Sequence, residues 1–315
     1  MKILNWRINS KLQKETENNY RHSFAVGLKD AEPMEIIHEL AFDGKASDIE
    51  ISDIEKLFNF VERKFLRKKI AGIGLEVGSG PAALSSVLAK KQAVEKIYAL
   101  EVCEPIVKIL MLKVVRYILG ESDNKIVGVV GDFDNLELPD SSIDFIFDFF
   151  SLHHSNNLGD TIKECGRVLK PGGFVLCFDK ARPDGYTKED LDGLMDTEYG
   201  AEGKKRFNVP AGQKFTRRMN GEKEYRLKDW KAVFMNGGFQ AVDYFYLAKP
   251  ISQSLLARVV KNFLAILPVF LQLRLNKLLP PPDFGSKFAL APQNRIFTRL
   301  VNKFPKEISF LIAYK

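Results

Sequence analysis

A glycine-rich turn at residues 74–85, GLEVGSGPAALS, is the stretch whose residue types first suggest ligand binding. Gly78 and Gly80 flank the small residue Ser79, and a further small residue, Ala83, follows three positions after Gly80. This is the spacing of a dinucleotide-binding turn, in which a ligand approaches the backbone closely and meets the free N–H groups of a helix N-terminus. The turn alone therefore predicts a ligand, and leaves open whether that ligand contains phosphate.

Three acidic residues near the turn narrow the choice of ligand. Glu76 lies two positions before Gly78, where a carboxylate would repel a pyrophosphate and attract a cationic group. Glu101 ends the next predicted strand, where a carboxylate can accept hydrogen bonds from both ribose hydroxyls, as it also does in nicotinamide enzymes. Asp132 ends the third predicted strand, where it could accept a hydrogen bond from an exocyclic amine such as that of adenine. Each carboxylate also has a structural interpretation, as a solvated strand end, a lysine partner or a turn cap.

The elements that must position these residues alternate along the chain. Short apolar runs predict strands at 70–78, 96–102, 125–132, 143–150, 174–181, 240–250 and 307–315. Helix-like patterns lie between them at 81–91, 104–120, 158–169 and 226–239. Strands that are almost continuously apolar are buried on both faces, so this alternation predicts a mostly parallel α/β sheet with helices on either side.

The domain organisation follows from the same pattern. Residues 1–70 are polar and helix-like and predict an N-terminal helical extension. Residues 71–315 predict the sheet domain, interrupted by inserts at 183–226 and 251–306. No internal repeat is present.

Four segments, LEVGSGPAALS, YALEV, GDFDNLELPDSSIDFIFDFFSLHH and ECGRVLKPGG, resemble the class I S-adenosylmethionine-dependent methyltransferases in order and spacing. The resemblance covers roughly residues 71–180, and GGFQAVDY and FLIAYK are similar to the last two strands of that family. It implies a Rossmann-like doubly wound sheet of seven strands, mostly parallel with an antiparallel last strand. It also implies S-adenosyl-L-methionine as the cofactor and no metal.

The resemblance implies eight cofactor-binding residues: Glu76, Gly78, Ser79, Gly80, Glu101, Asp132, Phe133 and Phe149. The glycine turn would surround the methionine part of the cofactor, with Glu76 on its ammonium side. Glu101 would hold the ribose, and Asp132 with the backbone of Phe133 would read the adenine. Phe149 would lie near the sulfonium, through a cation–π contact or simply as strand core.

Two adjacent histidines, His153 and His154, follow the fourth predicted strand, where an acceptor would lie. Methyl transfer needs chiefly alignment of the nucleophile, and needs a base only when the acceptor must lose a proton. Either histidine could remove that proton at neutral pH. Neighbouring side chains do not easily enter the same pocket, so we favour His153 as the base and keep His154 as a second candidate.

The acceptor is constrained mainly by exclusion. Residues 148–151 read DFFS, where amino-methylating DNA and protein-glutamine enzymes have an Asn-Pro-Pro-aromatic tetrad, and no Pro-Cys pair of cytosine-ring enzymes is present there. We therefore predict methylation, preferably at oxygen, of a small metabolite, a lipid or a glycan precursor. The alternatives are an RNA methyltransferase and a non-catalytic binding module that keeps the fold.

The positive charge is concentrated in the inserts. The chain has a net charge of +7, and residues 251–306 hold nine Lys or Arg and one Asp, so the remainder is close to neutral. Residues 202–226 hold eight basic and three acidic residues, which favours either a solvated loop or a lid that attracts an anionic acceptor. Because of this distribution we expect nucleic acid not to be the partner.

Residues 252–279 combine basic side chains with Leu and Phe at helical spacing. Such a helix is typical of peripheral membrane contact or of a cover for an amphiphilic acceptor, and can equally pack on the sheet domain or form a homodimer contact. The N-terminal residues contain no apolar run of signal-peptide length, and the three cysteines show no metal or disulfide spacing. We expect a cytoplasmic protein, either free or peripheral at the inner membrane surface.

Overall fold

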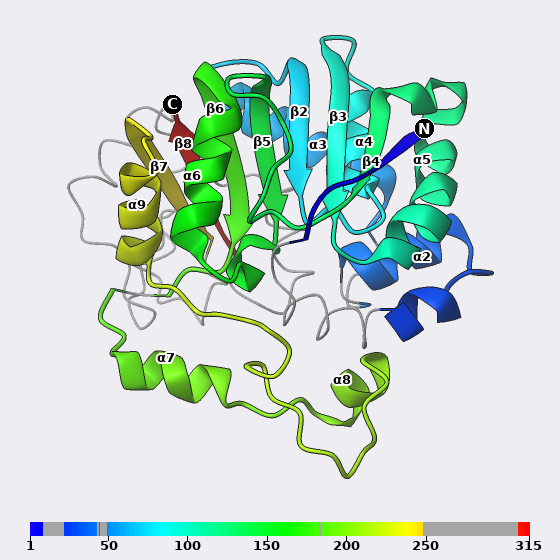
Figure 1. Cartoon of the computed structure of the whole chain (residues 1–315), viewed down its shortest axis with the longest axis vertical. Helices are drawn as coiled ribbons and strands as arrows, with labels where there is room; N and C mark the ends of the chain where they lie inside the picture. The colour runs from blue at the N-terminus through cyan, green and yellow to red at the C-terminus, as the bar shows by residue number, and fades with distance from the viewer. Residues whose placement is uncertain (9–21, 43, 45–48, 183, 248–307) are drawn as a thin grey trace, which may run out of the picture.

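The computed structural model describes residues 1–8, 22–42, 44, 49–182, 184–247 and 308–315 (Figure 1). Their centre is an eight-stranded sheet with the order β1-β4-β3-β2-β5-β6-β8-β7. Strand β8 runs antiparallel to β6 and β7, and the other neighbouring strands are parallel. The strands are β1 (Lys2–Asn5), β2 (Gly72–Val77), β3 (Val94–Glu101), β4 (Ile126–Val130), β5 (Ile143–Phe149), β6 (Leu169–Asp179), β7 (Ala241–Leu247) and β8 (Ile308–Tyr314).

Helices cover both faces of this sheet, as Figure 1 shows. One hydrophobic core lies under α2, α3, α4 and α5, and a second core lies under α6 and α9. The helices are α2 (Pro33–Ala41), α3 (Ile51–Lys64), α4 (Ala83–Ala89), α5 (Met111–Leu119), α6 (Leu158–Val168), α7 (Lys188–Met195), α8 (Ala201–Arg206) and α9 (Leu227–Asn236). Short helical turns form η1 (Ile106–Leu110), η2 (Gly120–Lys125) and η3 (Leu152–His154).

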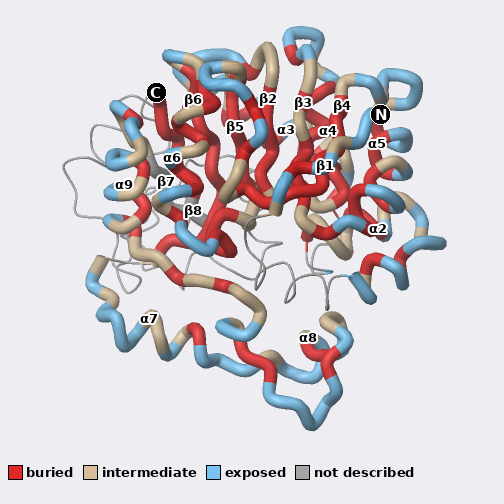
Figure 2. The backbone as a smooth tube through the Cα atoms, in the orientation of Figure 1, coloured by how far each residue is buried: buried red, intermediate tan, exposed pale blue. Residues whose placement is uncertain are grey.

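Strand β5 illustrates why the strands are apolar on both sides. Phe145 and Phe147 belong to the core on the α3 side, whereas Ile146 belongs to the core on the α6 side. The Phe147 ring meets Phe58 of α3 edge-on, with ring centroids 5.9 Å apart. Burial of apolar surface stabilises the fold by about 25 cal/mol per Å2. Strands that are buried on both faces therefore hold the helical layers to the sheet. Figure 2 shows the central strands as mostly buried and much of α7 as exposed.

The doubly wound fold and its antiparallel last strand are confirmed, and the strand count differs from the expected seven. The additional strand is β1, which pairs with β4 in parallel. It belongs to the N-terminal segment that we expected to be helical. The Trp6 N–H extends this pairing by donating to the Val130 carbonyl at 2.8 Å. Four residues are too few for a period to separate a strand from a helix, and only the exposed edge of β4 gives β1 its partner.

The long insert predicted at 251–306 lies between two neighbouring strands. Strands β7 and β8 pair in antiparallel register from Ala241 with Tyr314 to Leu247 with Ile308. The helix and the membrane contact that we predict for 252–279 lie outside the described residues and stay predictions. Within the part of the chain that the structure describes, no helix has the length and apolar character needed to span a bilayer.

Candidate active site

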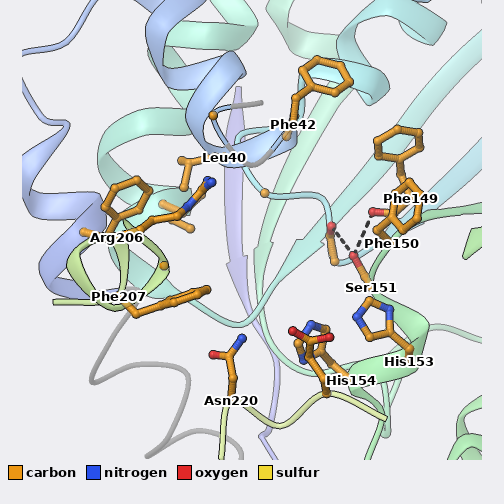
Figure 3. A pocket seen from close by; sticks show the side chains of 18 of the residues that line it. Leu40, Phe42, Phe149, Phe150, Ser151, His153, His154, Arg206, Phe207 and Asn220 are labelled. Carbon is orange, nitrogen blue, oxygen red and sulfur yellow. Dashed lines mark hydrogen bonds between the residues drawn. The ribbon is translucent and has the colours of Figure 1, made fainter. Parts of the chain in front are cut away.

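A cavity of about 520 Å3 opens at the carboxyl ends of β2, β5 and β6. Ligands of open α/β sheets bind at this edge. The cavity is lined by the glycine turn after β2, the segment after β5, the N-terminal segment around α2 and the 183–226 insert with α8, together with Leu84, Ile106 and Lys180. Figure 3 shows the phenylalanines Phe149 and Phe150 beside Ser151 and the two histidines, with Arg206 and Phe207 across the cavity.

The glycine turn uses its glycines in two different ways. Gly78 and Gly80 both have left-handed backbone angles, with φ of +66° and +50°. A Cβ on Gly78 would lie 2.3 Å from the side chain of Ser151, whose hydroxyl donates to the Gly78 carbonyl at 2.9 Å. A Cβ on Gly80 would meet only the Leu40 carbonyl oxygen, at 3.9 Å. Gly78 thus permits close packing, and Gly80 leaves open space for a ligand.

Glu76 lies in the cavity wall and is almost completely buried. Its Oε2 accepts a hydrogen bond from the Ser85 backbone N–H at 3.1 Å and another from the Ser85 hydroxyl. Burial raises the pKa of Glu76 to about 8, although the Ser85 hydrogen bonds oppose this rise. A group with a positive charge entering the cavity would favour the ionised carboxylate. The wall therefore fits the ammonium group of an amino-acid ligand.

Five of the eight predicted cofactor residues line the cavity, namely Glu76, Gly78, Ser79, Gly80 and Phe149. The other three, Glu101, Asp132 and Phe133, are buried outside its walls. The Glu101 carboxylate accepts from the backbone N–H groups of Gly80, at 3.0 Å, and Cys103, at 2.9 Å. The Asp132 carboxylate accepts from the Asp134 N–H at 2.8 Å. These two carboxylates thus hold backbone turns at the same sheet edge.

His153 is buried in the polar wall and is held by the aspartate that ends β6. Its Nδ1 lies 2.7 Å from Oδ1 of Asp179, and its backbone N–H donates to the other carboxylate oxygen at 2.9 Å. Burial raises the pKa of Asp179 to about 7, against the backbone hydrogen bonds of Lys180 and His153. An ionised Asp179 would accept a hydrogen bond from the Nδ1–H of His153. The other ring nitrogen, Nε2, would then be the basic one.

Lys180 follows Asp179 and extends this arrangement into the insert. Its Nζ lies 3.2 Å from Nε2 of His153 and 2.6 Å from Oε2 of Glu222. Glu222 also accepts from the Tyr199 hydroxyl and from Arg217, whose Nε and Nη2 lie at 3.0 and 2.8 Å. Burial alone would raise the pKa of Glu222, but the charges of Lys180, His153 and Arg217 outweigh it and hold this pKa far below its usual range.

His154 also lines the cavity, contrary to the expectation that only one of the two histidines would do so. The turn η3 places the two rings against each other, with centroids 4.3 Å apart and planes tilted by 41°. Both residues therefore line the cavity that a ligand would enter.

The cavity also has apolar and aromatic lining residues, which come from several parts of the chain. Phe149 packs edge-on against Phe42 and Phe150, with ring centroids 6.0 and 5.1 Å apart. Phe150 has φ of +58°, a left-handed angle that is rare for a bulky residue and often marks a functional segment. The apolar lining residues are Phe24, Leu40, Ala41, Phe42, Leu84, Ile106, Phe149, Phe150 and Phe207.

The 183–226 insert reaches across the mouth of the cavity to the N-terminal segment. Arg206 of α8 donates to the Glu39 backbone carbonyl, lies 3.8 Å from the Glu39 carboxylate and sits 5.3 Å above the Phe24 ring. Several basic residues of the insert form ion pairs with neighbouring acids: Lys204 with Glu198, Arg217 with Glu222 and Glu224, and Arg218 with Asp192 and Asp196. These pairs neutralise much of the charge that the sequence assigned to an anion-attracting lid.

A buried cluster on β5 and β6 contains residue types that can ligate a metal, and its groups hold their protons more tightly than usual. The ligand atoms of Asp148, Cys177 and Asp179 lie within 4.8 Å of one another. The Cys177 thiol donates to Asp148 at 3.4 Å, and burial raises the pKa of both groups well above their usual values. A protonated thiol and carboxyl are poor ligands, because metals bind the deprotonated forms.

Sequence reasoning missed Lys180, Tyr199, Glu222 and the aromatic residues Phe24 and Phe42. The Asp-Lys pair at the end of the fifth predicted strand was a detectable signal, since polar residues at strand ends often serve the site. Nothing in the local sequence around Tyr199 or Glu222 identifies their shared hydrogen bond.

Comparisons with known proteins match part of the chain to methyltransferases. Residues 75–177 match the profile of a family described as "Methyltransferase domain". The malonyl-[acyl-carrier protein] O-methyltransferase 1 of Coxiella burnetii is 43% identical over 56 residues, which cover 18% of this chain and 20% of that protein. The demethylmenaquinone methyltransferase of Listeria welshimeri is 36% identical over 75 residues, which cover 24% of this chain and 32% of that protein. The aligned region thus spans less than a third of either relative.

Solved structures with a similar course of the chain include YcgJ of Bacillus subtilis, at 14% identity and a TM-score of 0.48, covering 84% of this chain and 99% of that chain. The phosphoethanolamine N-methyltransferase 2 of Haemonchus contortus has the same identity, 14%, and the same TM-score, 0.48, and covers 82% of this chain and 52% of that chain.

Proposed function

We propose that this chain is a class I S-adenosylmethionine-dependent methyltransferase, as its methyltransferase domain at residues 75–177 supports, and that it transfers a methyl group to the hydroxyl of a small amphiphilic molecule. One observation carries the proposal: a single cavity joins the glycine turn, a histidine paired with a buried aspartate, and an aromatic wall. The turn suits the amino-acid end of the cofactor, the histidine suits a hydroxyl, and the aromatic wall suits an apolar substituent.

The residues around the glycine turn support the cofactor assignment. Gly80 leaves room at the backbone, and Glu76 offers a buried carboxyl to an ammonium group. When bound, S-adenosylmethionine supplies an electrophilic methyl group on a sulfonium sulfur. Glu101 and Asp132 would hold the adenosine part once their side chains exchange backbone partners for the ligand, and this role rests on the family resemblance.

His153 is the proposed general base. Asp179 orients its ring through Nδ1, as the aspartate of a hydrolytic triad orients its histidine. A base within hydrogen-bond reach of the reacting hydroxyl contributes typically about 100- to 10,000-fold in rate. His154 lies beside it and would contact the acceptor rather than the reacting proton.

The acceptor proposal rests on the contrast between the polar and the aromatic lining residues of the cavity. One relative is named as an O-methyltransferase of malonyl-[acyl-carrier protein] and the other as a methyltransferase of demethylmenaquinone, so the first name supports an oxygen acceptor. An RNA acceptor is less well supported, because several cations of the 183–226 insert are paired with carboxylates rather than presented to a phosphate backbone.

Titration calorimetry with S-adenosylmethionine, S-adenosylhomocysteine and NAD tests the first part of the proposal. We expect binding of the two sulfur cofactors and none of NAD. Incubation with labelled cofactor and separated pools of lipids, small metabolites, glycans and RNA tests the second part. Label that appears only in RNA would contradict the proposed acceptor class, and binding of NAD alone would contradict the cofactor.

A further inference from the structure

We propose that Lys180 and His153 act as a pair on the acceptor and select an acidic hydroxyl, that of a phenol, an enol or a carboxylic acid. Lys180 would bind the oxygen as it becomes an oxyanion, and His153 would take its proton. The inference rests on the proposed methyl transfer and narrows its acceptor class.

The distance between the two nitrogens allows one oxygen to meet both. Nζ of Lys180 and Nε2 of His153 lie 3.2 Å apart, and both residues line the cavity. An oxygen at about 2.8 Å from each nitrogen completes a triangle without moving either group, since that is an ordinary hydrogen-bond length. The oxygen would accept an N–H of Lys180 and donate its own proton to Nε2.

Lys180 has a donor to offer. An ammonium group has three N–H donors. Within the part of the chain that the structure describes, Glu222 takes one of them, and His153 takes a second until the acceptor oxygen displaces that contact and leaves Nε2 to receive the proton. The side chain is only 7% exposed, so a third N–H directed at an acceptor would act where bulk water does not compete.

The charges around the pair leave Lys180 able to bind an anion. Glu222 is shared between Lys180 and Arg217, and Glu224 is shared between Arg217 and Arg182. The three cations Lys180, Arg217 and Arg182 therefore share two carboxylates, which leaves one positive charge in excess. Asp179 adds a negative charge on the far side of His153 only when it is ionised, and the neighbouring groups Tyr199 and His154 face the same space.

The same ammonium makes His153 a base for acidic protons. A proton on Nε2 would place a second positive charge 3.2 Å from Nζ, and Coulomb repulsion opposes this in a buried site. An aliphatic alcohol, which releases its proton reluctantly, would be a poor acceptor here. A phenol, enol or carboxylic acid needs less from the base and gains more from the ammonium.

The transfer step balances within this arrangement. For a phenol or an enol, the acceptor O–H bond breaks and its proton passes to Nε2 of His153, whereas a carboxylic acid enters already ionised as the carboxylate. The oxygen lone pair forms the bond to the methyl carbon as the carbon–sulfur bond breaks, and that electron pair stays on sulfur. The products are a methyl ether or ester, S-adenosylhomocysteine and, for a phenol or an enol, a protonated His153, which returns its proton to solvent after release.

A chromogenic phenol tests the oxyanion site without requiring turnover. The probe is a 4-nitrophenol with an octyl substituent, titrated spectroscopically with the full chain saturated with S-adenosylhomocysteine. We expect the bound probe to ionise about 1 pH unit lower than in buffer, as an opposite charge within hydrogen-bond distance produces. Lys180→Met should abolish the shift, and Lys180→Arg should keep part of it.

The matched control is Lys205→Met, because Lys205 is an exposed lysine of α8 outside the cavity lining. It should retain the full shift. An unshifted probe in the unaltered protein, or a shift that survives in a Lys180→Met protein with normal circular dichroism, would overturn the inference. Lys180→Arg guards against misfolding, because it keeps the charge that Glu222 requires.

A matched acceptor series separates this inference from the proposed function. 4-Octylphenol, octanoic acid, octan-1-ol and octylamine are each incubated with labelled cofactor, and the first two should be methylated. Methylation of the alcohol or the amine in preference would overturn the acidic-hydroxyl inference and leave methyl transfer intact. Failure of S-adenosylmethionine to bind would instead overturn the proposed function.

Discussion

Glu76 is a carboxyl group that burial keeps mostly protonated at pH 7, because its pKa is raised to about 8. An ammonium group in the cavity would favour the ionised form, so cofactor binding should release a proton near pH 7. Cofactor affinity should therefore weaken as the pH falls below about 8, by up to about 10-fold per pH unit. Calorimetry in two buffers with different ionisation enthalpies measures this release directly.

Glu76→Gln provides the control for that measurement. Glutamine has a similar shape but no proton to lose, so both the proton release and the pH dependence should disappear. Identical binding heats in the two buffers for the unaltered protein would show that Glu76 does not ionise on binding.

Gly78 is the residue of the turn that can least accept a side chain. Gly78→Ala places a Cβ 2.3 Å from Ser151 at a left-handed φ, so we expect destabilisation of about 1–3 kcal/mol in urea unfolding and loss of cofactor binding. Gly193→Ala in α7 is the matched control, because its Cβ meets nothing within 4 Å. That change should be neutral or stabilising by about 0.5–1 kcal/mol. Equal stability of the two variants would refute the packing argument.

Helix α8 lies beside the cavity, and its residue Arg206 joins the insert to the N-terminal segment. Arg206→Ala removes the contacts with Glu39 and Phe24, which join the insert to the segment around α2. We expect a several-fold faster release of S-adenosylhomocysteine, measured by stopped-flow displacement, with little change in the unfolding midpoint. The physical reason is that this contact holds a cover, and the sheet core does not depend on it.

Arg218→Ala is the comparison for this element, since Arg218 also belongs to the insert and pairs with Asp192 and Asp196 near α7, away from the cavity. Its release rate should match that of the unaltered protein. Equal acceleration by both changes would mean that the insert acts as a whole rather than through the Arg206 contact.

The charge distribution of the whole molecule leads to a prediction about membranes. The positive excess belongs to residues 251–306, in which 252–279 combine basic and apolar side chains. We expect the full chain to sediment with anionic vesicles at low salt and to dissociate as salt rises, because screening acts over about 10 Å at 0.1 M. Neutral vesicles serve as the control.

Deletion of residues 252–279 should abolish vesicle binding and leave cofactor affinity nearly unchanged. An absence of vesicle binding at low salt would contradict the membrane proposal. Analytical ultracentrifugation of the full chain and of the deletion variant then distinguishes the two remaining roles. A dimer that is lost on deletion indicates a homodimer contact, and an unchanged mass indicates packing within one chain.

Features that depend on neighbours in the sequence were predictable from the sequence itself. The glycine turn, the parallel strands and the helices between them each leave a local pattern, because strand burial on both faces requires an apolar run and a tight turn requires glycine. The spacing also identified Glu76, the glycine turn and the two histidines, which all line the cavity. Strand β1 escaped prediction because four residues have no readable period and depend on the open edge of β4.

The composition of the site was decided by tertiary structure. His153 meets Asp179 across 26 positions of sequence, and Lys180 meets Glu222 across 42. No local pattern encodes such pairs, because they arise where strand ends and an insert converge at one edge of the sheet. Packing also turned Glu101 and Asp132 toward backbone N–H groups and brought Phe42 and Arg206 to the cavity. The sequence alone determined that the chain has a glycine turn between a strand and a helix, and only the folded chain decided which charges face the cavity, since charges interact through space and not along the chain.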